Sequence, residues 1–135
     1  MLEYKINAYS KVGGEAKSIV NNSVIQFDAS ANNDIDLPNP VELLLSSLAA
    51  CILKNVERYS VILKYPYRSA QIQIKAFRPT TSPTIEKIEY LLEIETDIEE
   101  KHLKNWHKNI LKFGTISNTI SKGTKLEGHI NFLKK

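Results

Sequence analysis

The stretch NPVELLLSSLAACILKNVERYS, residues 39–60, carries the strongest structural signal of the chain. Its first residue can cap a helix, Pro40 suits a first helical turn, and Glu42 puts a negative charge near the positive end of the helix dipole. We therefore predict a helix from Val41 to about Ser60. Apolar residues lie on nearly all of its sides, so it must be covered by a sheet on one side and by another helix or a partner subunit on the other.

Upstream of this helix the pattern indicates β-structure. Apolar and polar residues alternate from Leu2 to Ala8, Gly13 and Gly14 supply a turn, and a second strand-like run follows over residues 18–27. An N-terminal hairpin is the simplest interpretation. The segment between this run and the helix is rich in Asn and Asp, which predicts a surface loop.

Downstream of the helix, residues 70–76 and 88–94 alternate apolar and polar side chains, which predicts two strands with one wet face each. The connection between them contains two prolines and cannot be strand, so an antiparallel pair is expected. A last alternating segment over residues 126–132 predicts one more strand.

A second helix is expected between these strands. Asp97 and Glu100 resemble a capping box at its start, and Gly114 stands where a C-terminal glycine belongs. A short helix should follow from Thr115. Helices and strands together indicate an α+β fold, and the length suits one domain over residues 1–135.

The composition excludes several classes of protein. The net charge is +3 with both signs interspersed, so no nucleic-acid-binding patch is visible. The longest uncharged stretch, residues 43–53, is about half the roughly 20 residues that a membrane span needs. One cysteine cannot form an internal disulfide, and the N-terminus lacks a secretion signal, so we expect a cytosolic protein without a membrane partner.

Cys51 is the only plausible nucleophile, because the sequence has no nucleophile elbow and its histidines are scattered. On a helix, Lys54 and Arg58 share the face of Cys51, and their charges would favour the thiolate. Burial in an apolar helix would oppose it. An inert core cysteine remains the alternative interpretation.

Glu42 precedes Cys51 by nine residues, which places it half a turn round the helix and about 13 Å along the axis. Its simplest role is to stabilise the helix N-terminus, and a catalytic role beside Cys51 would require another subunit or a ligand. His102, His107 and His129 have no metal-ligand spacing, and no phosphate-binding loop is present. We therefore predict no metal and no cofactor.

Residues 39–51 resemble the central-helix signature of the OsmC/Ohr superfamily, and the segment 112–120 follows in the same family's order. The resemblance covers nearly the whole chain. It implies an OsmC-like fold, in which antiparallel sheets pack around a long central helix and two chains intertwine as a homodimer. It also implies thiol-dependent reduction of organic hydroperoxides, a defence against oxidative stress, at the dimer interface.

The match to the peroxidases of this family is incomplete. Cys51 occupies the position of the attacking cysteine, but Gly114 stands where the second, resolving cysteine is expected. The glutamate of the peroxidatic branches would fall at Val41, whereas Glu42 is shifted by one, which resembles the YhfA-like branch. The family's active-site arginine comes from the N-terminal strands, yet no arginine precedes Arg58.

Two functions follow from this resemblance, and a purely structural dimer without a ligand is a third alternative. The first is a one-cysteine peroxidase, in which Cys51 and Glu42 are the candidate catalytic residues and an external thiol restores the sulfur. The second is a non-catalytic homodimer that binds a lipid-like or aromatic small molecule in the family's apolar interface pocket.

Overall fold

The computed structural model describes residues 1–134, and the chain divides into two compact units, residues 1–44 and residue 45 onward. Each is described by itself. Helices and strands form separate runs in an α+β fold, as predicted. Among residues 1–134, no helix is long and apolar enough to cross a membrane.

The first unit holds an antiparallel sheet of β1 (Asn7–Ser10), β2 (Glu15–Val20) and β3 (Ser23–Asp28), in that order. The predicted hairpin therefore has three strands instead of two. The second predicted strand is divided because Asn21 adopts a left-handed conformation, φ 56°, and turns the chain. Asparagine tolerates this conformation better than most residues do, which is why the turn falls there.

The central helix is α1 (Pro40–Leu63), three residues longer than predicted at its C-terminal end. It begins with a reciprocal cap: the Asn39 N–H donates to the Glu42 carboxylate at 3.0 Å, and the Glu42 N–H donates to the Asn39 side chain at 2.9 Å. The helix ends where Lys64 turns left-handed, φ 58°. Pro66 follows and disfavours a longer helix.

The second unit contains a sheet of β4 (Ser69–Phe77), β5 (Lys87–Glu95) and β6 (Lys125–Phe132), in that order. β4 and β5 pair antiparallel, as expected. β6 pairs parallel to β5, so this sheet is mixed, whereas the resemblance implied antiparallel sheets. Parallel neighbours need a crossover connection, and α2 (Glu100–Lys112) and α3 (Thr115–Ile120) form it.

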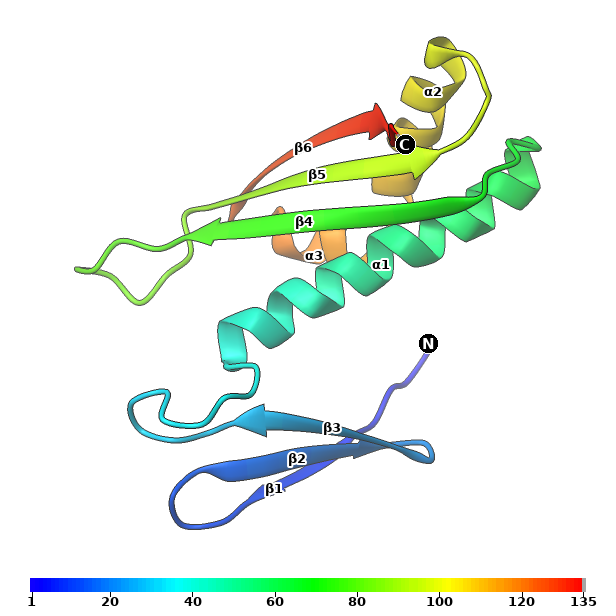
Figure 1. The fold of residues 1–135 in the computed structure, drawn as a ribbon. Helices are drawn as coiled ribbons and strands as arrows, with labels where there is room; N and C mark the ends of the chain where they lie inside the picture. The colour runs from blue at the N-terminus through cyan, green and yellow to red at the C-terminus, as the bar shows by residue number, and fades with distance from the viewer. Residues whose placement is uncertain (135) are drawn as a thin grey trace. The chain divides into compact units, whose positions relative to one another are not determined.

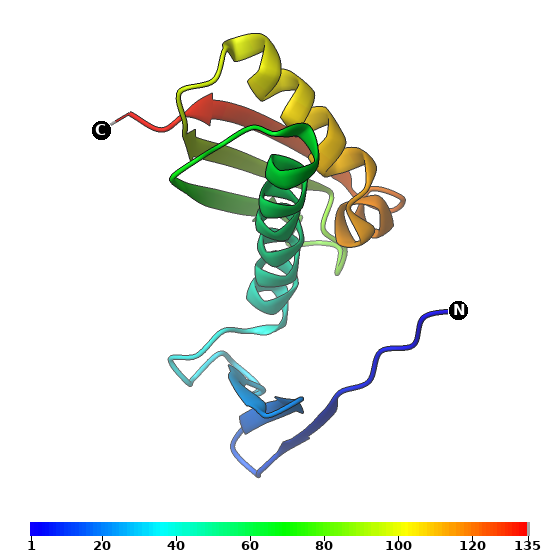
Figure 2. The same ribbon diagram turned by 90° about the vertical axis from the view of Figure 1, so that its right-hand side faces the viewer.

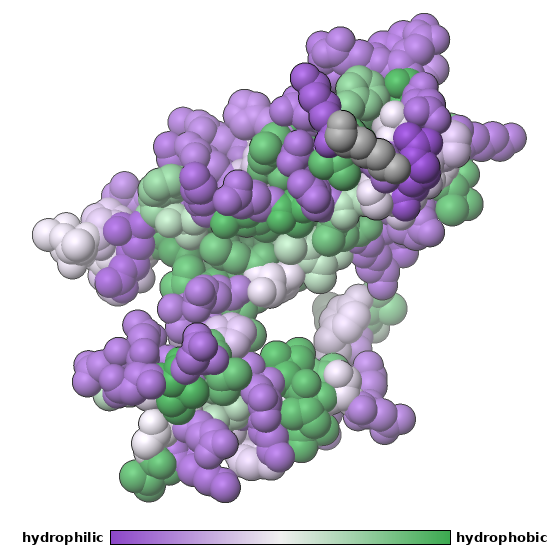
Figure 3. Space-filling model, in the orientation of Figure 1, coloured by the Kyte–Doolittle hydropathy of each residue, from purple (hydrophilic) through white to green (hydrophobic). Residues whose placement is uncertain are grey.

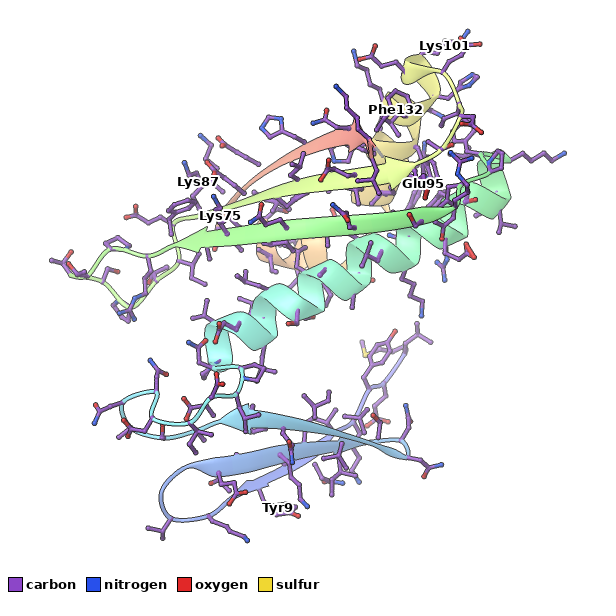
Figure 4. All side chains as sticks on the ribbon, in the orientation of Figure 1. Tyr9, Lys75, Lys87, Glu95, Lys101 and Phe132 are labelled. Carbon is purple, nitrogen blue, oxygen red and sulfur yellow. The ribbon has the colours of Figure 1, made fainter. Side chains whose placement is uncertain are left out.

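One face of the β4–β6 sheet is covered by α1 and α2 (Figures 1 and 2). The other face carries polar side chains, among them Gln71 and Glu93, which are hydrogen-bonded to each other. Lys75 and Lys87 lie on that polar face, where Lys87 pairs with Glu89 at 2.9 Å (Figure 4). The alternation predicted for β5 is confirmed, since every second residue enters the core. The buried apolar residues of this unit are Leu48, Ile52, Val56, Tyr59, Ile88, Tyr90, Leu92, Ile94, Leu103, Trp106 and Ile110.

The capping box predicted for the second helix is wrong. α2 begins after Glu99, which forms no side-chain cap, and Asp97 instead accepts a hydrogen bond from Arg68 at 2.8 Å. This ion pair lowers the pKa of Asp97, first through the hydrogen bond and then through the Arg68 charge. A partner that is distant in sequence thus takes the side chain that the local pattern assigned to the helix.

Candidate functional site

Cys51 lies in the middle of α1 within the second unit, and its side chain is partly exposed. Lys54 and Arg58 follow it on the same helix and are exposed. Neither cation forms an ion pair among residues 1–134, and no hydrogen bond within that range reaches the Cys51 sulfur. The sulfur is therefore a free thiol with two uncompensated positive charges on its own helix.

Gly114 lies next to the Cys51 sulfur. A Cβ placed on Gly114 would lie 3.2 Å from the Cys51 Sγ, although 63 residues separate the two in the sequence. In a disulfide, each sulfur lies about 3 Å from the Cβ of the other cysteine, given the S–S length and bond angles. The structure thus brings together the attacking position and the position where the resemblance expects a second cysteine.

The side chains around position 114 leave no free space for a Cβ atom. Gly114 has φ −80°, which any residue can adopt. A Cβ would overlap the Ser117 hydroxyl oxygen and would lie 3.1 Å from the Ile110 carbonyl oxygen. The gap that a cysteine side chain would need is therefore already filled by Ser117.

Ser117 is a residue of this site that the sequence analysis missed. Its side chain is 3% exposed, and its hydroxyl donates to the Gly114 carbonyl at 3.1 Å, with a longer contact to the Leu111 carbonyl at 3.5 Å. Serine commonly donates a hydrogen bond to a carbonyl three residues earlier in a helix, so no motif or spacing distinguishes Ser117 from other serines. Only the fold places it and the Cys51 sulfur on the same side of Gly114, around the position that a Cβ would take.

Three side chains hold α1 against the end of α2 and so fix Cys51 beside Gly114. Asn55 is buried and donates to the Ile110 carbonyl at 3.1 Å, and the Trp106 indole N–H donates to the Val56 carbonyl at 3.1 Å. The Tyr59 ring stacks on Phe113 at 5.4 Å. Buried carbonyls that lose their donors are costly, so the register of these helices is well determined.

Glu42 has a structural role. Its carboxylate accepts the Asn39 N–H at the start of α1, and its side chain is exposed. This arrangement agrees with the simpler of its two predicted roles, stabilisation of the helix N-terminus. No contact in the structure assigns Glu42 to the chemistry of Cys51.

The histidines take no part in the Cys51 site. His107 is half-buried, and its Nε2 lies 2.5 Å from the Tyr90 hydroxyl. Burial lowers the pKa of His107, as does the nearby His129, and burial raises the pKa of Tyr90. The Tyr90 hydroxyl therefore donates a hydrogen bond to the Nε2 atom of a neutral His107. In the described part of the chain, no three acidic, histidine or cysteine side chains form a metal site.

Comparison with known proteins gives one family. Residues 31–128 match the family model of the OsmC-like protein. The search of curated proteins finds no match. Many solved structures share the fold. The OsmC-like protein from Mycoplasma pneumoniae is 19% identical with a TM-score of 0.89, and the alignment covers 98% of this chain and 99% of that one.

Two further structures are of proteins that are named for hydroperoxide resistance. The organic hydroperoxide resistance protein OsmC from Legionella pneumophila is 12% identical, has a TM-score of 0.76, and is covered over 100% of its length by 99% of this chain. OhrB of Bacillus subtilis is 12% identical with a TM-score of 0.71, covering 94% of this chain and 98% of that one. At these identities the structures share the fold, and the family model assigns the chain: it belongs to the OsmC-like protein family.

Proposed function

We propose that this protein is a thiol-dependent peroxidase that reduces organic hydroperoxides through the single cysteine Cys51. The observation that carries the proposal is the position of Cys51. It is a partly exposed free thiol on the central helix, and its sulfur lies next to Gly114. The hydroperoxide resistance proteins of Legionella and Bacillus, which share the fold, support the choice of substrate. The sequence pattern at Glu42 further favours a YhfA-like branch of the family.

The reaction begins with the Cys51 thiolate, which attacks the outer oxygen of the hydroperoxide. An S–O bond forms as the O–O bond breaks, so the sulfur is oxidised by two electrons and an alcohol leaves after protonation. Cys51 is then a sulfenic acid. Two exposed cations, Lys54 and Arg58, lie on the same helix face as this sulfur.

An external thiol must complete the cycle. Because position 114 is glycine, no second cysteine of the chain can capture the sulfenic acid. A small thiol condenses with it instead, which releases water and forms a mixed disulfide, and a second thiol frees Cys51. The reducing thiols of the cytosol would supply both equivalents.

We further propose that the active form is a homodimer. The first unit exposes large apolar side chains, which is unusual for a lone sheet in water. Figure 3 shows hydrophobic residues, in green, at the surface of this unit. A second chain would cover them. The exposed apolar residues of this unit include Leu2, Tyr4, Ile6, Val12, Ile19, Val24, Ile25, Val41 and Leu44.

The proposal is tested by hydroperoxide consumption. Purified protein is mixed with cumene hydroperoxide and either a monothiol or a dithiol, and peroxide loss is followed together with the mass of the protein. We expect turnover with both reductants and one sulfenic acid per chain at Cys51, while Cys51→Ser consumes peroxide at the background rate. Turnover that survives in Cys51→Ser, or wild-type protein without sulfenic acid, would refute the proposal.

A binding protein without catalysis is the second candidate. Two observations favour it: Gly114 cannot resolve an oxidised sulfur, and the Glu42 carboxylate is used in the helix cap. In this case a lipid-like or aromatic molecule would bind the homodimer equally well in wild type and in Cys51→Ser. Co-purified ligands identified by mass spectrometry, together with an absence of turnover, would decide for binding.

A further inference from the structure

The space between Cys51 and Ser117 has a use that depends on the oxidation state of the sulfur. The Cys51 Sγ and the Ser117 hydroxyl oxygen lie within 3.2 Å of one point, the site of a Cβ on Gly114. No hydrogen bond joins them in the reduced protein. An oxygen atom added to the sulfur in the direction of this point would lie closer to the hydroxyl than the sulfur itself does.

Ser117 has the bonding capacity to meet that oxygen. A hydroxyl can donate one hydrogen bond and accept two. In the described residues Ser117 acts only as a donor, to the Gly114 carbonyl at 3.1 Å and more weakly to the Leu111 carbonyl at 3.5 Å. Its acceptor positions are unused although the side chain is 3% exposed. A buried oxygen with unused acceptor capacity gains from a new donor.

We infer that Ser117 is a positioning residue for oxidised Cys51: the sulfenic acid O–H donates to the Ser117 hydroxyl, which continues to donate to the Gly114 carbonyl. This inference rests on the proposed peroxidase function. Gly114 is needed because any larger side chain would displace the Ser117 hydroxyl from this position. In this chain no second cysteine can convert the sulfenic acid to a disulfide. The hydrogen bond from the sulfenic acid to Ser117 instead stabilises the intermediate.

This stabilisation matters because over-oxidation of the sulfenic acid competes with its reduction by the external thiol. A second peroxide can oxidise it to the sulfinic acid, with formation of a second S–O bond and loss of water or alcohol, and this product does not return to the thiol. The deprotonated sulfenate is the better nucleophile toward peroxide. A hydrogen bond that keeps the proton on the oxygen therefore slows over-oxidation and leaves time for the external thiol.

The test measures the fate of the sulfenic acid apart from its formation by organic hydroperoxide. Cys51 is oxidised with hydrogen peroxide, catalase removes the excess, and the sulfenic acid is quantified over time with dimedone. Its conversion to sulfinic acid by fresh hydrogen peroxide is followed by intact mass. Loss of one hydrogen bond predicts about three- to tenfold faster over-oxidation in Ser117→Ala. The first oxidation of Cys51 should keep its wild-type rate.

Two further variants separate this role from a general effect on folding. Gly114→Ala keeps the serine but pushes its hydroxyl aside, so it should over-oxidise like Ser117→Ala. Ser121→Ala is the matched control, since the Ser121 hydroxyl also donates to a carbonyl three residues earlier, that of Asn118 at 3.1 Å, and should match wild type. Ser117→Thr, which restores the hydroxyl, should restore slow over-oxidation.

The outcomes are distinct. Wild-type over-oxidation rates in Ser117→Ala, or a first oxidation step that is accelerated by the same factor as over-oxidation, would overturn the role of Ser117. A protein that forms sulfenic acid with hydrogen peroxide but never turns over cumene hydroperoxide would refute the proposed function, while the Ser117 comparison would still be decided by the oxidation rates.

Discussion

The two units of this chain differ sharply in what they bury. Among residues 1–134, Ala16 is the one apolar residue of the first unit that is buried, whereas the second unit buries a continuous set from α1, β5 and α2. In the first unit the sheet is held by backbone pairing with little side-chain burial. A three-stranded sheet whose apolar side chains stay exposed is marginal in water. The comparison teaches that the second unit carries the stability of the single chain, while the first unit leaves its apolar side chains exposed, as the proposed homodimer requires.

The largest expected effect on the free energy of unfolding comes from removing a core side chain of the second unit. Trp106→Ala deletes a fully buried ring and the donor to the Val56 carbonyl, so the free energy of unfolding should fall by about 3–5 kcal/mol. Ile25→Ala, in a side chain that is 45% exposed, should cost far less in dilute, monomeric protein. Urea denaturation measures both. Equal losses would mean that the first unit has a core of its own.

A charge in the first unit sharpens the same comparison. Val24 lies on β3 and is 54% exposed, so Val24→Asp should leave the fold of a single chain intact. If a second chain covers this strand, the buried carboxylate should weaken the dimer more than about tenfold. Sedimentation velocity across a concentration series measures this. The control, Asn22→Asp, adds the same charge at the adjacent turn and should leave the dimer unchanged, and a dimer equally unaffected by Val24→Asp would place the interface elsewhere.

The smallest expected effect concerns Glu42. Glu42→Ala removes the carboxylate that caps α1 and should cost about 1 kcal/mol of unfolding free energy, while Glu42→Gln, which can still accept the Asn39 N–H, should cost less. The oxidation rate of Cys51 should be the same in both variants. If Glu42→Gln keeps its stability but oxidises much more slowly, the carboxylate belongs to the active site.

Local patterns in the sequence predicted local structure well. The apolar run that contains Cys51 is the central helix, and the alternating segments around Ile72 and Leu92 are paired strands. The turn at Asn21, which divides one predicted strand, is a local failure, whereas two others came from partners distant in sequence. Arg68 captures Asp97 and so prevents the expected helix cap. The crossover through α2 and α3 makes β6 parallel to β5.

The candidate site divides in the same way. Cys51 was identified from its residue type and helix, and the position of Gly114 came from the family resemblance. Ser117 gave no signal, because its place in the site depends on how the fold brings Gly114 next to the Cys51 sulfur. A serine three residues after a glycine is typical of many short helices, so no periodicity or motif could single it out.

The most direct test of the account is the rate at which Cys51 reacts with a thiol-alkylating reagent in the native protein, measured from pH 5 to pH 9 and compared with the urea-unfolded chain. The account predicts that native Cys51 is alkylated readily at neutral pH, at least as fast as in the unfolded chain, because a peroxidase needs an accessible thiolate. Alkylation that occurs only after unfolding would show an inert core thiol and would contradict the account.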